Sequence, residues 1–115
     1  MTYRSPPEFD PKGLAPNDPG AKLDGGKVRL GLVVAGFSRA ITAMGHVGTY
    51  GANKYSDNGW LSVANGEARY TDALLRHLLA DLAGETHDSE SGLPHLDHAL
   101  WNLAAVCELR KRKEK

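Results

Sequence analysis

The chain has little cysteine, no excess of one charge and no long apolar run. Its 115 residues include one cysteine, so no internal disulfide can form, and we expect a reducing, cytoplasmic compartment with Cys107 as a buried structural thiol. Lysine plus arginine and aspartate plus glutamate both number 14, and this balance argues against a protein that holds long nucleic acid by its phosphates. No apolar run approaches the length of a membrane span, and the N-terminus MTYRSPPEFD lacks the apolar core of a signal peptide. A small charged ligand is the class of partner that remains.

Proline is concentrated at the N-terminus and is nearly absent elsewhere. Residues 1–26 hold five of the six prolines and show almost no apolar periodicity, so we expect a flexible arm that is disordered or extended. Residues 27–109 are then the folded domain, and residues 110–115 are a charged tail. Because the core of so short a domain is small, we expect the protein to form a homo-oligomer.

Apolar residues in the folded part recur at intervals of three and four, which predicts helices. One helix is expected from Arg29 through Val47, a second from about Ala68 to Leu82, and a third from Leu96 through Cys107. No strand pattern competes. The expected fold is an all-α bundle of three main helices, with the second and third as a helix-loop-helix core and the first packed across them. The glycines of the first helix predict close approach of a partner helix, a ligand or a second subunit.

Histidines, carboxylates and an amide gather around the second and third predicted helices. On a helical wheel, His95, His98 and Asn102 fall in one sector of the third helix and can converge on one ligand. His77 and Asp81 lie at the edge of the leucine stripe of the second helix. Neutral imidazoles and carboxylates suit a divalent metal. A purely structural cluster that fixes the hairpin stays open as the alternative.

Cations and aromatic residues form two further groups. One group precedes the first helix among glycines, where amides and cations can meet a phosphate: Lys22, Lys27 and Arg29. The other lies in the loop NKYSDNGW, where Lys54 can reach a phosphate while Tyr55 and Trp60 stack on a base. The first group is a weak motif, because it lacks both Walker and dinucleotide spacing, and filling of a small core is the alternative role of the aromatic residues in the second.

Three blocks of the sequence resemble a known family. GAKLDGGKVRLGLV, VGTYGANKYSDNGW and RYTDALLRHLLADLAGETHDSESGLPHLDHALWN are similar to the phage-encoded dATP/dGTP diphosphohydrolase N-terminal domain family, over about Gly20 to Leu109. The resemblance implies a phage or prophage protein, an all-helical fold related to MazG-like pyrophosphohydrolases, and a purine nucleotide as ligand. MazG-like enzymes hold magnesium with Glu-x-x-Glu on one helix and Glu-x-x-Asp on the next. Neither the second nor the third predicted helix carries that pair of motifs, so the resemblance predicts nucleotide binding more directly than hydrolysis.

Two functions follow as expectations, and the sequence assigns no catalytic residue for either. The first is a metal-dependent diphosphohydrolase that cleaves dATP or dGTP between the α- and β-phosphates in the host cytoplasm during infection, with magnesium or manganese as cofactor. Its metal ligands would be drawn from Asp72, His77, Glu85, Glu90, His95 and His98. Its nucleotide-binding residues would be drawn from Lys22, Lys27, Arg29, Lys54, Tyr55, Trp60, Arg69, Arg76 and Asn102.

The second expected function is a non-catalytic phage sponge. Such a protein would sequester a nucleotide immune signal, either a cyclic oligonucleotide or an ADP-ribose derivative, and so block host defence. The same cations and aromatic residues would form its pocket at a subunit interface, and the histidines would donate hydrogen bonds without any cofactor.

Overall fold

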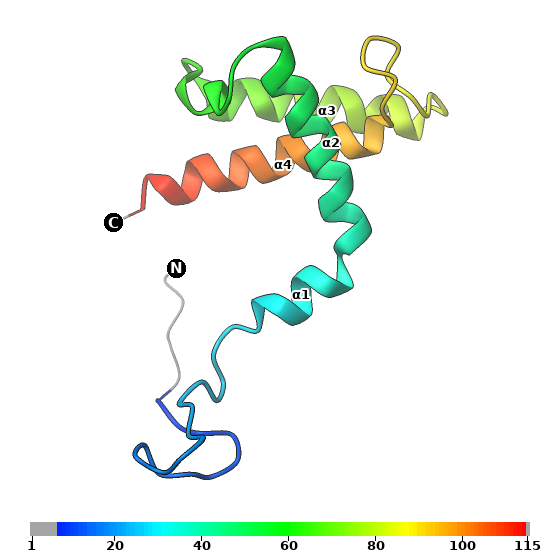
Figure 1. The fold of residues 1–115 in the computed structure, drawn as a ribbon. Coiled ribbons are helices and arrows are strands. Elements are labelled where there is room, and N and C mark those ends of the chain that lie inside the picture. Colours follow the sequence, from blue (N-terminus) through cyan, green and yellow to red (C-terminus); the bar gives the residue numbers. More distant parts are fainter. Residues whose placement is uncertain (1–6, 115) are drawn as a thin grey trace. The chain divides into compact units, whose positions relative to one another are not determined.

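The computed structural model describes residues 7–114, and within them every regular element is helical. The elements are the α-helices α1 (Leu30–Gly36), α2 (Ser38–Lys54), α3 (Gly66–Leu82) and α4 (His95–Arg112), with the 3₁₀ helix η1 (Gly59–Ser62) between α2 and α3 (Figure 1). The predicted all-α fold is therefore confirmed. Contacts divide the chain into two compact units, the first ending at Gly36 and the second beginning at Phe37.

The N-terminal unit is organised by one buried carboxylate. Asp10 is 6% exposed, and its carboxylate accepts hydrogen bonds from the backbone N–H groups of Lys22 and Lys12, both at 2.7 Å. These bonds, led by that of Lys22, hold the pKa of Asp10 below its usual value. Gly25 donates a backbone hydrogen bond to Phe9 at 2.8 Å and lies so close to the Phe9 ring that a Cβ would clash. Residues 7–29 thus form turns without helix or strand, and residues 1–6 of the predicted arm lie outside the described residues.

The single helix expected from Arg29 through Val47 is wrong, because the helix is interrupted. α1 ends at Gly36 and α2 begins at Ser38, with Phe37 between them at φ −107° and ψ 26°. Glycine at position 36 adds no side-chain contact that would hold the helix together and has the lowest helix propensity after proline. Among the described residues no single helix has the length and apolar character of a membrane span, although α1 and α2 taken together meet both measures.

In the second unit, α3 and α4 form the predicted hairpin and α2 packs across α4 (Figure 1). Its buried apolar side chains are small: Val47 on α2, and Ala99, Ala105 and Val106 on α4. Small side chains let helix axes approach closely. The linker of residues 83–94 leaves α3 through Gly84, whose φ of 94° is the left-handed conformation that favours glycine. It returns to α4 with a hydrogen bond from the His95 N–H to the Thr86 carbonyl at 2.8 Å.

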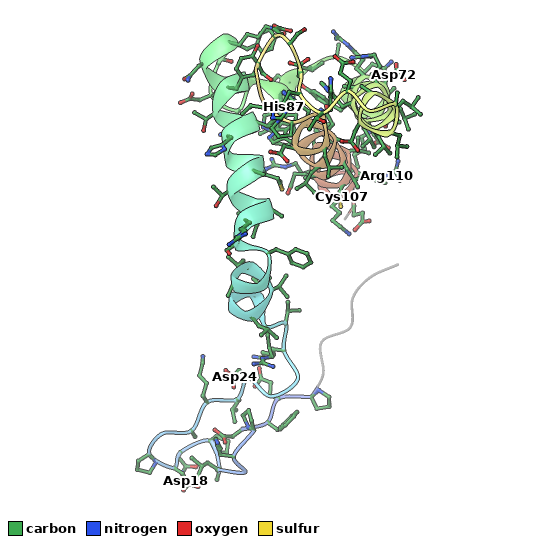
Figure 2. All side chains as sticks on the ribbon, turned by 90° about the vertical axis from the view of Figure 1, so that its right-hand side faces the viewer. Asp18, Asp24, Asp72, His87, Cys107 and Arg110 are labelled. Atoms are coloured by element: carbon green, nitrogen blue, oxygen red, sulfur yellow. The ribbon has the colours of Figure 1, made fainter. Side chains whose placement is uncertain are left out.

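Several apolar residues of the hairpin face outward. The exposed leucines are Leu75, Leu79 and Leu82 on α3, and Leu96 and Leu103 on α4. Cys107 is also exposed on α4, so the expected burial of this thiol is wrong (Figure 2). The apolar run LAAVCEL suggested a buried position, but the helix turns Val106 into the core and leaves the next residue on the outer side.

Candidate functional site

The second unit contains a cleft of about 1090 Å³. Its walls come from α2, the loop that contains η1, α3, the linker and α4. Its chemically distinctive lining residues are the aromatic Tyr50, Tyr55, Trp60, Tyr70 and Trp101, the cations Lys54, Arg69 and Arg76, and the polar His77, Asp88, Glu90, His98 and Asn102. Pockets for small ligands measure roughly 300–1,000 Å³, so this cleft has room for a nucleotide.

Three aromatic rings from three elements form one wall of the cleft. Trp101 of α4 meets Trp60 of η1 at 5.5 Å between ring centroids and Tyr70 of α3 at 5.7 Å, both edge to face. Desolvation raises the pKa of Tyr70. Gly48 of α2 lies beside the Trp101 ring, where a Cβ would stand 3.1 Å from the indole Nε1. The close approach predicted at the glycines of this helix is therefore found at Gly48. A Cβ at Gly45 or Gly51 would meet no atom within 4 Å.

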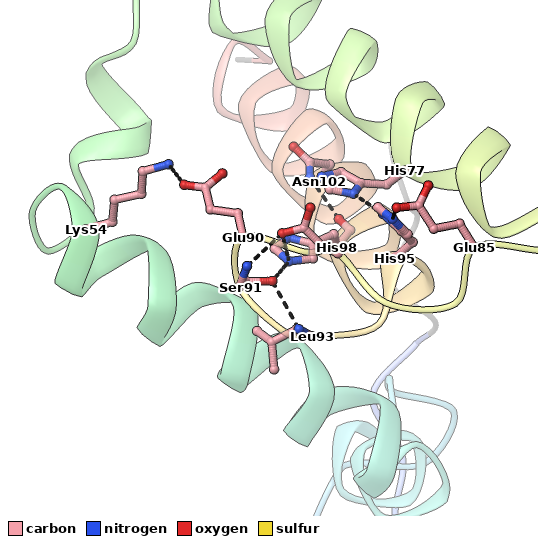
Figure 3. Close-up of polar contacts among 10 residues, drawn as sticks. Lys54, His77, Glu85, Glu90, Ser91, Leu93, His95, His98 and Asn102 are labelled. Atoms are coloured by element: carbon pink, nitrogen blue, oxygen red, sulfur yellow. Dashed lines mark hydrogen bonds and ion pairs between the residues drawn. The ribbon is translucent and has the colours of Figure 1, made fainter.

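Histidines from α3 and α4 form a second group in the site (Figure 3). The rings of His77 and His98 are stacked, with centroids 4.5 Å apart and planes inclined by 10°. His77 Nδ1 lies 2.8 Å from His95 Nδ1, so one of these nitrogens donates a hydrogen bond and the other accepts it. Desolvation, and then the neighbouring imidazoles, lower the pKa of His77, and desolvation also lowers the pKa of His98. Both rings are therefore neutral at pH 7.

The linker supplies a carboxylate and a hydroxyl to the histidines. Asp88 Oδ2 accepts a hydrogen bond from the Ser91 backbone N–H at 2.9 Å and lies 3.8 Å from His98 Nε2. Burial opposes ionisation of Asp88, but the hydrogen bonds of Ser91 outweigh it and hold the pKa of this carboxyl below its usual value. Ser91 Oγ lies 2.7 Å from His98 Nε2 and accepts the Leu93 N–H at 3.1 Å, so this hydroxyl connects His98 to the backbone of the linker.

A second carboxylate of the linker, Glu85, faces His95. Its Oε1 lies 3.4 Å from His95 Nε2, without the geometry of a hydrogen bond (Figure 3). That nitrogen is buried and has no hydrogen-bond partner among the described residues. An unsatisfied buried nitrogen costs free energy, and a bound water, a bound ion or a catalytic role can account for such a group.

Glu90 ties the linker to the end of α2 through an ion pair with Lys54 (Figure 3). The hydrogen bond from Lys54, and then that from Tyr50, lowers the pKa of Glu90, while the same ion pair raises the pKa of Lys54. Burial, followed by the interaction with Glu90, raises the pKa of Tyr50, whose ring also meets His98 edge to face at 6.3 Å. Lys54, one of the cations that line the cleft, is thus paired with a carboxylate.

The structure brings most of the predicted site residues to this cleft, although it does not test their roles. Asn102 lines the cleft, but its Nδ2 donates to the His98 carbonyl of its own helix at 2.8 Å. Tyr55 lines the cleft with 77% of its surface exposed. Asp72 is exposed on α3 and is not among the lining residues (Figure 2). Glu85 and His95 lie in the second unit but are not among the lining residues, and three predicted residues belong to the N-terminal unit: Lys22, Lys27 and Arg29.

Four of the lining residues named above were not among the predicted site residues: Tyr50, Tyr70, Asp88 and Trp101. Asp88 lies in a linker, where a carboxylate needs no functional reason, and its contact with His98 depends on how the linker folds back. Tyr50 lies four residues before Lys54, and this helical spacing was the available signal. Tyr70 precedes the leucine stripe of α3, and only its contacts with Trp60 and Trp101 reveal its place in the wall.

Comparison with known proteins adds a family to this geometry. No curated protein and no solved structure matches the chain. The family model described as "dATP/dGTP diphosphohydrolase, N-terminal" matches residues 17–115, a range that includes every residue lining the cleft. The resemblance noted in the sequence is therefore confirmed, and the chain belongs to the dATP/dGTP diphosphohydrolase N-terminal domain family.

Proposed function

We propose that the cleft binds a purine nucleoside triphosphate, dATP or dGTP. The observation that carries this proposal is the pairing of an aromatic wall with cations in one cleft of about 1090 Å³. A purine ring can stack against Trp60 or Trp101, because every base has a π-face. Lys54, Arg69 and Arg76 line the same cleft and supply positive charge for the phosphates. Membership of a family that handles deoxypurine nucleotides supports this choice of ligand.

The phosphates would displace an internal carboxylate. Lys54 is paired with Glu90, so an incoming phosphate competes with Glu90 for the ammonium group. A nucleotide phosphate carries more negative charge than a carboxylate and accepts more hydrogen bonds. Ligand binding is therefore expected to separate Glu90 from Lys54 and to loosen the contact between the linker and α2.

The proposed reaction is hydrolysis between the α- and β-phosphates, which yields a deoxynucleoside monophosphate and pyrophosphate. A water oxygen attacks the α-phosphorus, the bond to the bridging oxygen breaks, and pyrophosphate leaves. In this proposal the neutral imidazole of His98 would accept the proton of that water, because its lowered pKa keeps it unprotonated at pH 7. A divalent cation, magnesium or manganese, would neutralise the triphosphate, with a donor atom available from Asp88.

A second function is supported by what the helices lack. Neither α3 nor α4 carries a Glu-x-x-Glu motif, and the carboxylates of the site come from the linker. An aromatic cleft without a full carboxylate set is also suited to a phage sponge that sequesters a nucleotide signal of host defence and releases it unchanged. In either case the proposed setting is the cytoplasm of an infected host cell.

One experiment separates the two functions. The purified protein is incubated with dATP, dGTP and a panel of cyclic and ADP-ribose-derived nucleotides, with manganese or with EDTA, and the free and heat-released ligands are analysed by chromatography. A monophosphate product that requires the metal supports the enzyme, and loss of this product in His77→Gln but not in His46→Ala assigns it to the cleft. Depletion of one nucleotide that reappears intact after heating supports the sponge. Failure of every nucleotide to bind would refute both.

We also propose that the protein self-associates through the exposed leucines of α3 and α4. Leu75, Leu79 and Leu82 lie on one face of α3 and are 48%, 63% and 72% exposed. The buried apolar side chains of the described residues are one valine from α2 and two alanines and a valine from α4, which is a small core for a domain of this length. A second copy that covers the leucine face would add the apolar burial that one chain lacks.

A further inference from the structure

We infer that His77, His95 and Asp88 form a binding site for a borderline transition metal of the Zn²⁺, Co²⁺ or Ni²⁺ class. Each of the three residues offers one ligand atom, and these atoms all lie within 4.8 Å of one another. They come from α3, α4 and the linker, so the site exists only when the hairpin and its linker are folded. The inference concerns metal binding alone and does not depend on the proposed nucleotide.

The type of metal follows from the donor atoms. Two imidazole nitrogens and one carboxylate suit zinc, cobalt, nickel or iron, whereas magnesium prefers oxygen ligands at octahedral positions. Three protein ligands are also the usual number in zinc sites that keep a position open for water or substrate. Because His77 and Asp88 line the cleft, such an open position would face it.

The buried His95 ring gives an independent argument. In the structure His77 Nδ1 and His95 Nδ1 share one hydrogen bond at 2.8 Å, while His95 Nε2 is buried without a hydrogen-bond partner. A cation between the two Nδ1 atoms requires both to present a lone pair, so each neutral ring must carry its proton on Nε2. No proton is gained or lost, since the ring that donates through Nδ1 only changes tautomer. The proton of His95 then lies on Nε2.

That change of tautomer supplies the missing partner. Glu85 Oε1 is 3.4 Å from His95 Nε2, a short adjustment away from a hydrogen bond. Histidines that bind metals generally donate their other N–H to a carboxylate or carbonyl, which orients the ring and increases its basicity. Glu85 is thus a positioning residue for His95, and the unsatisfied Nε2 is explained as the N–H donor to Glu85 when Nδ1 binds the metal.

The stack of His98 on His77 completes the local arrangement. Ser91 engages His98 Nε2 at 2.7 Å, and the His98 ring is stacked face to face on His77. This contact fixes the plane of His77 without using its nitrogens. His98 is therefore assigned to support the metal ligand and not to bind the metal.

The inference is tested by titrating the full chain with Co²⁺ and Zn²⁺. The protein is first treated with a chelator, which is then removed. Cobalt binding is followed by its visible d–d absorption, zinc by competition with a chromogenic chelator, and Mg²⁺ serves as the comparison ion. We expect one Co²⁺ or Zn²⁺ per chain and no competition from Mg²⁺ at equal concentration. Asp88→Asn and His77→Gln should weaken binding by roughly 100-fold or more, and Glu85→Gln by roughly 10- to 100-fold. His46→Ala and His87→Ala remove exposed histidines outside the set and should bind as the wild type does.

The outcomes are separable from the fate of the proposed function. Circular dichroism establishes that each variant is folded, and Asp88→Asn keeps the shape of the side chain if the histidine variant does not fold. Wild-type protein that fails to bind Co²⁺ or Zn²⁺ would overturn the inference, as would unchanged affinity in Asp88→Asn. Nucleotide binding measured with Mg²⁺ and without any transition metal reports on the cleft independently. Failure of the wild-type protein to bind any nucleotide in this measurement would count against the proposed function and not against the metal site.

Discussion

Replacing Gly48 by alanine tests how closely α2 approaches the aromatic wall. A Cβ at this position would lie 3.1 Å from Nε1 and 3.6 Å from Cδ1 of Trp101. The indole cannot easily withdraw, because Trp60 and Tyr70 already contact it at centroid distances of 5.5 Å and 5.7 Å. Gly45, one turn earlier on α2, has no atom within 4 Å of the equivalent Cβ and provides a matched control.

Two opposing effects set the expected magnitude. Exchange of glycine for alanine inside a helix stabilises the fold by about 0.8–1 kcal/mol. Insertion of a methyl group into a tightly packed contact costs about 1–3 kcal/mol. Gly45→Ala should therefore raise the free energy of unfolding by about 1 kcal/mol. Gly48→Ala should leave it unchanged or lower it by up to about 2 kcal/mol, although helix propensity alone would give the two variants the same gain.

Urea unfolding of both variants, followed by circular dichroism at one protein concentration, measures the difference. With a slope of about 1–2 kcal/mol per molar urea, the two midpoints should be separated by roughly 0.5 M or more, with Gly45→Ala higher. Tryptophan fluorescence of the folded Gly48→Ala protein should also shift, because the wall must rearrange. Equal stabilisation by both substitutions would refute the close packing of α2 on Trp101.

Three further predictions concern charge and assembly. Arg110 and then Lys113 lower the pKa of Glu67, so this carboxylate stabilises the folded state above its unfolded pKa and loses that effect as the pH falls through its folded pKa. Glu67→Gln should therefore be less stable than the wild type at pH 7, and the gap measured by urea unfolding should close as the pH falls through the lowered, folded-state pKa of Glu67; a gap that persists in acid would contradict the ion-pair explanation. If the proposed phosphate site is correct, Lys54→Met should weaken binding of dATP or dGTP by roughly tenfold or more, and Glu90→Gln, which frees Lys54, should strengthen it in the same calorimetric titration. An opposite order would place the phosphates elsewhere. Leu79→Lys puts a charge on the exposed leucine face and should convert an oligomer to monomer in sedimentation velocity, whereas Leu14→Lys, on the N-terminal loop, should not; a wild-type monomer would refute self-association through this face.

The helices of the hairpin were predictable because their information is local. The leucine stripe ending at Leu82 and the glycine at position 84 give the end of α3 directly, and the second stripe gives α4. The break at Phe37 was not predictable, since apolar residues continue through it at helical intervals and only the folded chain shows where the helix stops. The burial of Cys107 failed for a related reason, because an apolar run does not say which side of a helix meets a neighbour.

The sequence by itself determined the all-α class, the hairpin and the residue types of the site, because helical periodicity and residue chemistry act over a few neighbouring positions. It also placed His77, His95 and His98 near one another, through the short linker that joins their helices. Only the tertiary structure decided which atoms meet. The fold of the linker brings Asp88 and Glu85 to the histidines, and the crossing of α2 over α4 sets Gly48 against Trp101. Such contacts form or fail when segments far apart in the chain shift by about a few tenths of an ångström, and no local sequence pattern specifies positions that closely.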